Sequence, residues 1–310
     1  MIWGLVVRST GSWYDVLTDD GERVPCKVKG NFRLRGIRST NPVAVGDCVH
    51  IVRDGTSAFI TEIEERRNFI VRRASNLSKQ SHILAANVDA CLLVATLRRP
   101  ETSTTFMDRC LASAEAYRVA AAIAFNKTDL LNPAERQEQA ALAEMYRRIG
   151  YEVFEISALD AATLSPLREY LRGKRTLIAG NSGVGKSTLL NALIPTANVR
   201  TAEISEAHQT GMHTTTFSEL FPLPEGGSLI DIPGIKGFGT FNMAREEIAH
   251  YFPEIFHTSR ECRFDNCTHT HEPGCAVQHA LECGQIAASR YASYLSMLED
   301  EEEGKYRTPL

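Results

Sequence analysis

The sequence lacks any apolar run of about 18 residues, the length needed for a membrane-spanning helix. It also lacks a basic amino-terminal segment followed by a long apolar stretch, so we expect no signal peptide and a cytoplasmic protein with no membrane contact. No internal repeats occur. The net charge of −4 excludes a globally basic nucleic-acid-binding protein, so any RNA contact must come from a local patch.

What is present indicates a globular chain of two or three domains. Hydrophobic residues make up 43% and charged residues 23% of the 310 residues, which is ordinary for globular proteins. Eight cysteines in a chain of this length do not suggest a secreted disulfide framework. Three of them lie close to histidines near the C-terminus, which in a reducing compartment indicates a metal site.

The pattern along the chain changes twice. Short strands separated by turns over residues 1–73 predict a small β-barrel, and we interpret the basic stretch 66–79 as a linker. Over residues 74–240, apolar strands alternate with helices, which predicts a parallel sheet covered by helices. The strands are expected at 88–97, 119–125, 151–156 and 176–179, and the helices at 105–117 and 133–149. The pattern over residues 241–310 predicts a helix, then a Cys/His cluster, then a second helix. An acidic stretch at 299–303 is expected to be a solvated tail.

A phosphate-binding loop follows the strand at 176–179. The motif GxxxxGK[ST] comprises Gly180, Asn181, Ser182, Gly183, Val184, Gly185, Lys186 and Ser187, and Thr188 continues into a predicted helix. Glycines let backbone N–H groups converge on phosphate oxygens. Lys186 would reach the β- and γ-phosphates, and the Ser187 hydroxyl would bind Mg²⁺. The alternative is a glycine-rich turn without a ligand.

A second motif selects the base. Asn126, Lys127, Thr128 and Asp129 follow the strand ending at Phe125, at the carboxyl edge where open α/β sheets bind ligands. The Asp129 carboxylate can accept two hydrogen bonds from guanine but none from adenine, whose edge lacks those donors. Lys127 would lie along the base plane and Asn126 would brace the loop. Alone, this motif is also compatible with a capped helix start.

Two further matches at strand ends support a guanine site. Ser157 and Ala158 follow the strand ending at Ile156, where a backbone N–H can meet guanine O6. Asp231 and Gly234 bound a DxxG motif, in which Asp231 would hold Mg²⁺ through water and the Gly234 N–H would sense the γ-phosphate.

The motif order is permuted, because the base motifs precede the phosphate loop and DxxG. A parallel sheet keeps its arrangement if the chain is cut after DxxG and the old ends are joined. This cut places both accessory segments beside the γ-phosphate sensor, so we predict that nucleotide state changes their orientation.

The candidate switch segment is 211–216. Among its threonines, we expect Thr215 to complete Mg²⁺ coordination. Ile235 stands where other GTPases orient water with glutamine, so another group must do this. His213 is the nearest candidate in sequence, with an ordinary exposed loop histidine as the alternative.

The cysteine cluster has the spacing of a zinc site. Cys262, Cys267, His269 and Cys275 offer a closed Cys₃His set, which is typical of structural Zn²⁺. Other possible ligands nearby are His271, His279 and Cys283, and free cysteines are the alternative. We interpret the remaining cysteines, at 26, 48, 91 and 110, as small core residues.

A basic stretch in the barrel suggests RNA. Between residues 23 and 45 there is no acidic residue, Phe32 is interleaved, and the basic residues are Arg23, Lys27, Lys29, Arg33, Arg35 and Arg38. Cations can track phosphates while an aromatic ring stacks on a base. An ordinary solvated charged face remains the alternative.

Together these motifs resemble the circularly permuted ribosome small-subunit-dependent GTPase A family (RsgA, also called YjeQ). The resemblance covers essentially the whole chain and includes Val45-Gly46-Asp47, Ala86-Asn87-Val88-Asp89 and His213-Thr214-Thr215-Thr216. It implies an OB-fold barrel (1–73), a permuted GTPase domain (74–240) and a helical zinc-binding domain (241–310). It also implies zinc on Cys262, Cys267, His269 and Cys275 and a catalytic role for His213.

The resemblance further implies hydrolysis of GTP to GDP, stimulated by the small ribosomal subunit late in its assembly, with the protein contacting rRNA; we expect a monomer. An alternative is an RNA-binding module whose nucleotide acts only as a conformational lock. A third hypothesis, a GTPase for tRNA modification or metal delivery, has no separate catalytic constellation to support it.

Overall fold

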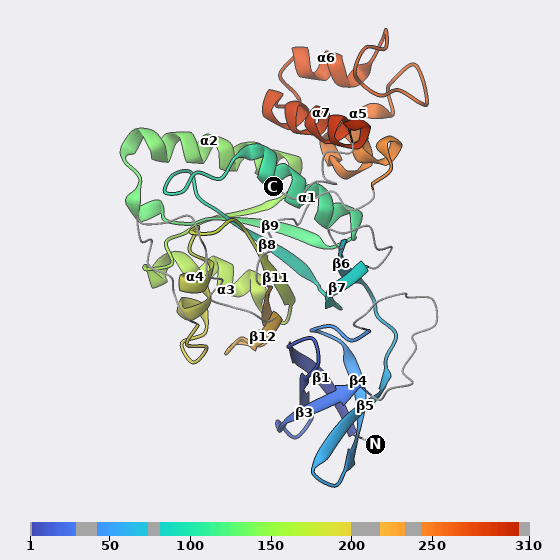
Figure 1. Cartoon of the computed structure of the whole chain (residues 1–310). Coiled ribbons are helices and arrows are strands. Elements are labelled where there is room, and N and C mark those ends of the chain that lie inside the picture. Colours follow the sequence, from blue (N-terminus) through green and yellow to red (C-terminus); the bar gives the residue numbers. More distant parts are fainter. Residues whose placement is uncertain (1, 29–41, 74–80, 200–217, 233–242, 304–310) are drawn as a thin grey trace.

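The computed structural model describes residues 2–28, 42–73, 81–199, 218–232 and 243–303. It has a β-barrel at one end, a central α/β domain, and a helical module at the other end (Figure 1). No helix within these ranges is both long and apolar enough to cross a bilayer.

The amino-terminal strands form a five-stranded barrel, as predicted. The strands are β1 (Ile2–Ser9), β2 (Tyr14–Thr18), β3 (Arg23–Val28), β4 (Cys48–Asp54) and β5 (Ser57–Ile63). They pair in the order β1-β2-β3-β5-β4, and β1 also pairs with β4, which closes the barrel. Alternate residues point inward, so that Val16, Ile51 and Ile60 lie in one apolar cluster.

The interpretation of residues 66–79 as a linker is wrong in part. Strand β6 (Phe69–Arg73) pairs antiparallel with β7 (Ser81–Ala86), forming a separate two-stranded sheet. The stretch looked irregular because its partner lies beyond a polar segment, and pairing between strands is not visible in local composition.

The central domain contains a mostly parallel sheet in the strand order β10-β9-β8-β11-β13-β12. Its parallel strands are β8 (Ala90–Ala95), β9 (Ala120–Phe125), β10 (Glu152–Glu155), β11 (Arg175–Ala179) and β13 (Ser228–Asp231). Strand β12 (Ser218–Pro222) runs antiparallel to β13. Every residue of β8 is buried, as expected for a strand covered on both faces.

Helices cover both faces of this sheet. Helices α1 (Thr104–Ala116) and α2 (Pro133–Ile149) share one apolar cluster with it, and α3 (Ser165–Leu171) and α4 (Lys186–Leu193) share another. The predicted bounds of α2 are correct because its ends carry local signals. Asn132 and Glu135 form a capping box, and Gly150 ends the helix with a φ of 114°.

The carboxyl-terminal module packs against α1. It comprises the 3₁₀ helix η3 (Arg245–Tyr251) and helices α5 (Pro253–Ser259), α6 (Ala276–Glu282) and α7 (Ala288–Glu303). Ala112 of α1 lies in the same apolar cluster as Phe252 and Ile255 of the module. Helix α7 extends through the acidic stretch that we expected to be a tail.

Candidate nucleotide and metal sites

The predicted nucleotide motifs meet at one edge of the central sheet. Asn126 follows β9, Ser157 is the second residue after β10, the phosphate loop follows β11, and Asp231 ends β13. Since β9, β10, β11 and β13 are parallel, their carboxyl ends lie at the same edge.

Direct contacts join the base motif to the phosphate loop. The Asn126 side-chain amide donates to the carbonyl oxygen of Val184 at 2.9 Å, and the Lys127 ammonium donates to that of Gly183 at 2.7 Å. A Cβ atom at Gly185, whose φ is 94°, would lie 2.4 Å from the Asn126 amide nitrogen. Only glycine therefore fits where the two motifs touch.

The cation of the phosphate loop is half-buried. The Lys186 ammonium donates to the carbonyl oxygens of Gly180 and Asn181 at 2.7 and 2.6 Å. Burial lowers the pKa of Lys186 and raises the pKa of Asp231, and the attraction between the two charges opposes both shifts. Half-buried, oppositely charged groups beside a glycine loop form an environment suited to phosphate and its counterion.

Other loop residues have distinct positions. Ser187 and Thr188 lie in the first turn of α4, where backbone N–H groups lack helical partners. Asn181 is half-buried and Ser182 is exposed. The Val184 side chain lies in the apolar core, so only its backbone can face a ligand.

The base motif forms a short turn after β9. Lys127 has a left-handed φ of 65°, and Thr128 and Asp129 start the 3₁₀ helix η1 (Thr128–Leu130), with the Asp129 side chain exposed. The backbone N–H of Ala158 donates to Asn126 Oδ1 at 2.9 Å, and that of Ser157 donates to Thr163 Oγ1 at 3.0 Å. These two N–H groups brace the loop, so a contact with guanine O6 would have to share one of them.

One contributor to this site was not predicted from the sequence. The Lys127 ammonium also donates to the carbonyl oxygen of Arg99 at 2.6 Å, in the loop between β8 and α1. Pro100 of this loop borders Gly183, since a Cβ atom there would lie 3.3 Å from the proline Cδ. This contact is tertiary and uses a backbone oxygen, so no sequence motif marks it.

Several predicted site residues lie outside the described part of the chain. They are His213, Thr215 and Gly234 of the switch segments and Lys29, Arg33, Arg35 and Arg38 of the basic stretch. Lys27 is described: it is exposed on β3, and its ammonium lies 4.4 Å from the centre of the Trp13 ring.

The four predicted zinc ligands come together. The ligand atoms of Cys262, Cys267, His269 and Cys275 lie within 4.8 Å of one another. His269 Nδ1 is 3.6 Å from the sulfurs of Cys262 and Cys275, which are 4.0 Å apart. Zn–S bonds of about 2.3 Å and a Zn–N bond of about 2.0 Å place tetrahedral ligand atoms roughly 3.5–3.8 Å apart, so this donor set fits Zn²⁺.

The competing ligands are held elsewhere. His271 Nδ1 contacts Thr270 Oγ1 at 2.8 Å, and His279 Nε2 lies 3.7 Å from the sulfur of Cys283 on α6. Among the earlier cysteines, those at 26, 91 and 110 are buried, as predicted, whereas Cys48 is half-buried.

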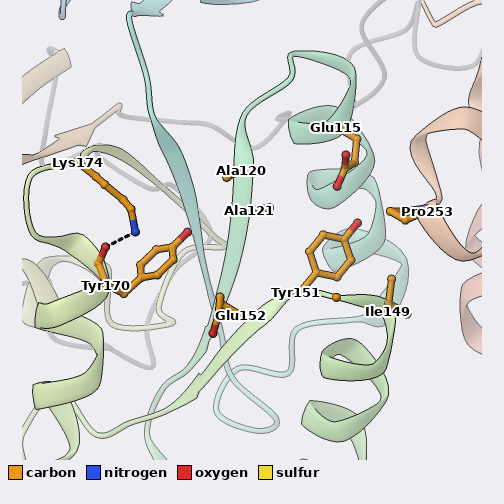
Figure 2. Close-up of a pocket in the computed structure, with 10 residues that line it drawn as sticks. Glu115, Ala120, Ala121, Ile149, Tyr151, Glu152, Tyr170, Lys174 and Pro253 are labelled. Carbon is orange, nitrogen blue, oxygen red and sulfur yellow. Dashed lines mark hydrogen bonds between the residues drawn. The ribbon is translucent and has the colours of Figure 1, made fainter.

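A cavity of about 320 Å³ lies at the opposite, amino edge of the sheet (Figure 2). Ala120 and Glu152, the first residues of β9 and β10, line it. On one side the Lys174 ammonium donates to the Tyr170 carbonyl oxygen at 2.5 Å and lies 3.6 Å from the centre of that ring. The predicted nucleotide residues lie at the other edge, so this cavity is separate from their site.

The fold and the order of these motifs define a circularly permuted P-loop GTPase with an amino-terminal barrel and a carboxyl-terminal Cys₃His module. Family models described as RsgA N-terminal domain and RsgA GTPase match residues 3–60 and 63–241. The chain belongs to the RsgA GTPase family.

Similar proteins match over nearly their full length. The chain is 64% identical over 306 residues to "Small ribosomal subunit biogenesis GTPase RsgA" of Bacteroides fragilis, covering 98% of each chain. The crystal structure of YjeQ from Thermotoga maritima aligns with a TM-score of 0.77 at 34% identity, covering 96% of this chain and 98% of that one. YloQ, described as a circularly permuted GTPase, aligns with a TM-score of 0.74 at 31% identity, covering 100% and 97%.

Proposed function

We propose that this chain hydrolyses GTP to GDP and phosphate while assisting late maturation of the small ribosomal subunit in the cytoplasm. The observation that carries the proposal is the contact between the base motif and the phosphate loop through Asn126 and Lys127. The full-length similarity to relatives named for small-subunit biogenesis supports the choice of partner.

In this proposal Asp129 reads the guanine edge and Lys186 binds the β- and γ-phosphates. Ser187 and Thr215 would hold Mg²⁺ directly and Asp231 would hold it through water, and the bound ion would neutralise phosphate charge. The Gly234 N–H senses the γ-phosphate. His213 orients the attacking water, because the aliphatic side chain of Ile235 cannot polarise it.

The remaining parts serve structure and partner binding. Zn²⁺ would be held by Cys262, Cys267, His269 and Cys275 and would be structural, because four protein ligands leave no position open. The barrel would contact rRNA through its basic residues, Lys27, Lys29, Arg33, Arg35 and Arg38. The protein would act as a monomer.

The test is the rate of GTP hydrolysis with purified ribosomal subunits. Small subunits should raise kcat by about 10²-fold or more, as partners that organise a GTPase switch do, and large subunits should not. Lys186→Ala should abolish GTP hydrolysis both with and without small subunits. If small subunits bind in a nucleotide-dependent way but leave the rate unchanged, the chain is instead an RNA-binding module with a nucleotide lock.

A further inference from the structure

The barrel and the central sheet share hydrogen-bonded strands. Strand β1 of the barrel pairs antiparallel with β12, with Arg8 opposite Glu219 and Ser9 opposite Ser218 (Figure 1). Strand β12 pairs in turn with β13, and there Glu219 is opposite Asp231. One row of residues therefore crosses three strands, from the barrel to the proposed Mg²⁺ carboxylate.

The barrel also holds the strand that leads to the phosphate loop. The carbonyl oxygen of Gly46, in the turn before β4, accepts hydrogen bonds from Arg175 Nη1 at 2.9 Å and Asn87 Nδ2 at 3.0 Å. Arg175 is the first residue of β11, and its backbone N–H donates to Asp89 at 2.8 Å. The strand that leads to the phosphate loop, β11, is thus tied to the barrel through Arg175, and the strand that ends at Asp231, β13, is tied to it through β12.

The two faces of the β1–β12 junction differ. On one face, Val7 of β1 lies in the same apolar cluster as Leu220 of β12. On the other, Arg23 Nη1 of β3 lies 3.7 Å from Glu219 Oε1, and these two side chains border a cavity of about 380 Å³. The junction is therefore packed on one face and open on the other, so the barrel has room to tilt toward the open face and to carry β12 with it.

Paired strands move together, because parting them breaks main-chain hydrogen bonds. A tilt of the barrel would consequently displace β12 and, through it, the end of β13. We propose that the barrel positions Asp231 through β12, so that RNA bound on the barrel accelerates GTP hydrolysis, with Arg23 and Glu219 as positioning residues. This inference rests on the proposed function and concerns the route by which the subunit acts on the nucleotide site.

The test separates subunit binding from stimulation. Glu219→Lys turns the attraction to Arg23 into repulsion, and the double variant Glu219→Lys/Arg23→Glu restores opposite charges. Glu225→Lys is the matched control, since it makes the same charge change in a partly exposed pair with Arg168, at 3.6 Å within the central domain. For each variant, kcat and KM for GTP are measured with and without small subunits, together with co-sedimentation in a non-hydrolysable GTP analogue.

Glu219→Lys should lower the stimulated kcat about tenfold, with KM and co-sedimentation within about twofold of the unmodified chain. The double variant should regain most of the stimulation, and Glu225→Lys should keep it. If Glu219→Lys is stimulated as strongly as the unmodified chain, or the double variant is no better than the single, the route through β12 is wrong although the proposed function stands. If small subunits do not stimulate the unmodified chain, both proposals fail.

Discussion

The barrel and the Cys/His module are joined to the central domain by different kinds of contact. Besides an apolar contact that includes Val7 and Leu220, the barrel is hydrogen-bonded to the central domain through main-chain groups, in the β1–β12 pairing and at the Gly46 carbonyl oxygen. Besides the apolar cluster that includes Ala112, the module has a buried ion network, in which Arg290 of α7 donates to Asp108 of α1 at 2.8 Å and to Glu254 of α5 at 2.6 Å. Arg290 and Asp108 are fully buried.

The two kinds of contact differ in how much movement they allow between the accessory part and the central domain. A buried ion network has one good geometry, and removing one partner leaves an uncompensated charge. It therefore favours a module that moves with α1 as one body. A junction of paired strands with one open face tolerates a tilt. The comparison sharpens the prediction that nucleotide state reorients the accessory parts: the barrel should move more than the module.

Removal of the metal should have the largest effect on stability. This effect should be confined to the Cys/His module and should leave the barrel folded. Structural Zn²⁺ contributes about 10 kcal/mol or more to folding of small domains, so chelation should unfold residues 243–303. Limited proteolysis would detect this, while GTP binding and the barrel persist. Cys283→Ser, at an exposed cysteine outside the cluster, should keep the metal. A module that resists protease after complete zinc loss would contradict a structural role.

Arg290→Met should weaken the module junction next. It leaves Asp108 and Glu254 buried without their cation, at a cost of about 3–5 kcal/mol in the free energy of unfolding. Arg147→Met is the matched control, because Arg147 forms a partly exposed pair with Glu155 at 3.2 Å, worth about 0–1 kcal/mol. Denaturant unfolding measures both, and equal effects would show that the buried network does not hold the module.

Gly46→Ala should weaken the barrel junction. Gly46 has a φ of 93°, and an added Cβ would lie 2.1 Å from the Ala86 carbonyl oxygen. Gly55→Ala is the control, since Gly55 has a φ of 59° with no atom within 4 Å of the added Cβ. Left-handed strain alone costs about 1–2 kcal/mol, and the clash should add about 1–3 kcal/mol to Gly46→Ala. Matching losses of stability in the two variants would mean that the turn is not packed against β7.

The parts of the molecule predicted from sequence are those whose signals are local. The phosphate loop, the Asn126–Asp129 motif and the four metal ligands are short runs in which spacing fixes the chemistry, and the structure brings each set together. Helix α2 has its cap and its terminating glycine in the chain itself.

The missed parts depend on distant partners. Strand β6 pairs with β7 across a polar stretch, and β12 has β1, more than 200 residues away, as its second neighbour. Arg290 and Asp108 are 182 residues apart, and neither lies in a recognisable motif. Such contacts follow from the assembled fold, and a single sequence does not display them.

The central claim is a pocket that selects guanine through Asp129, and titration calorimetry tests it most directly. The unmodified chain should bind GTP about 10⁴-fold more tightly than ATP. Asp129→Asn should lose GTP affinity and gain affinity for xanthosine triphosphate, whose 2-carbonyl oxygen can accept from the new amide. Equal affinity of the unmodified chain for ATP and GTP, or binding of neither, would contradict the account.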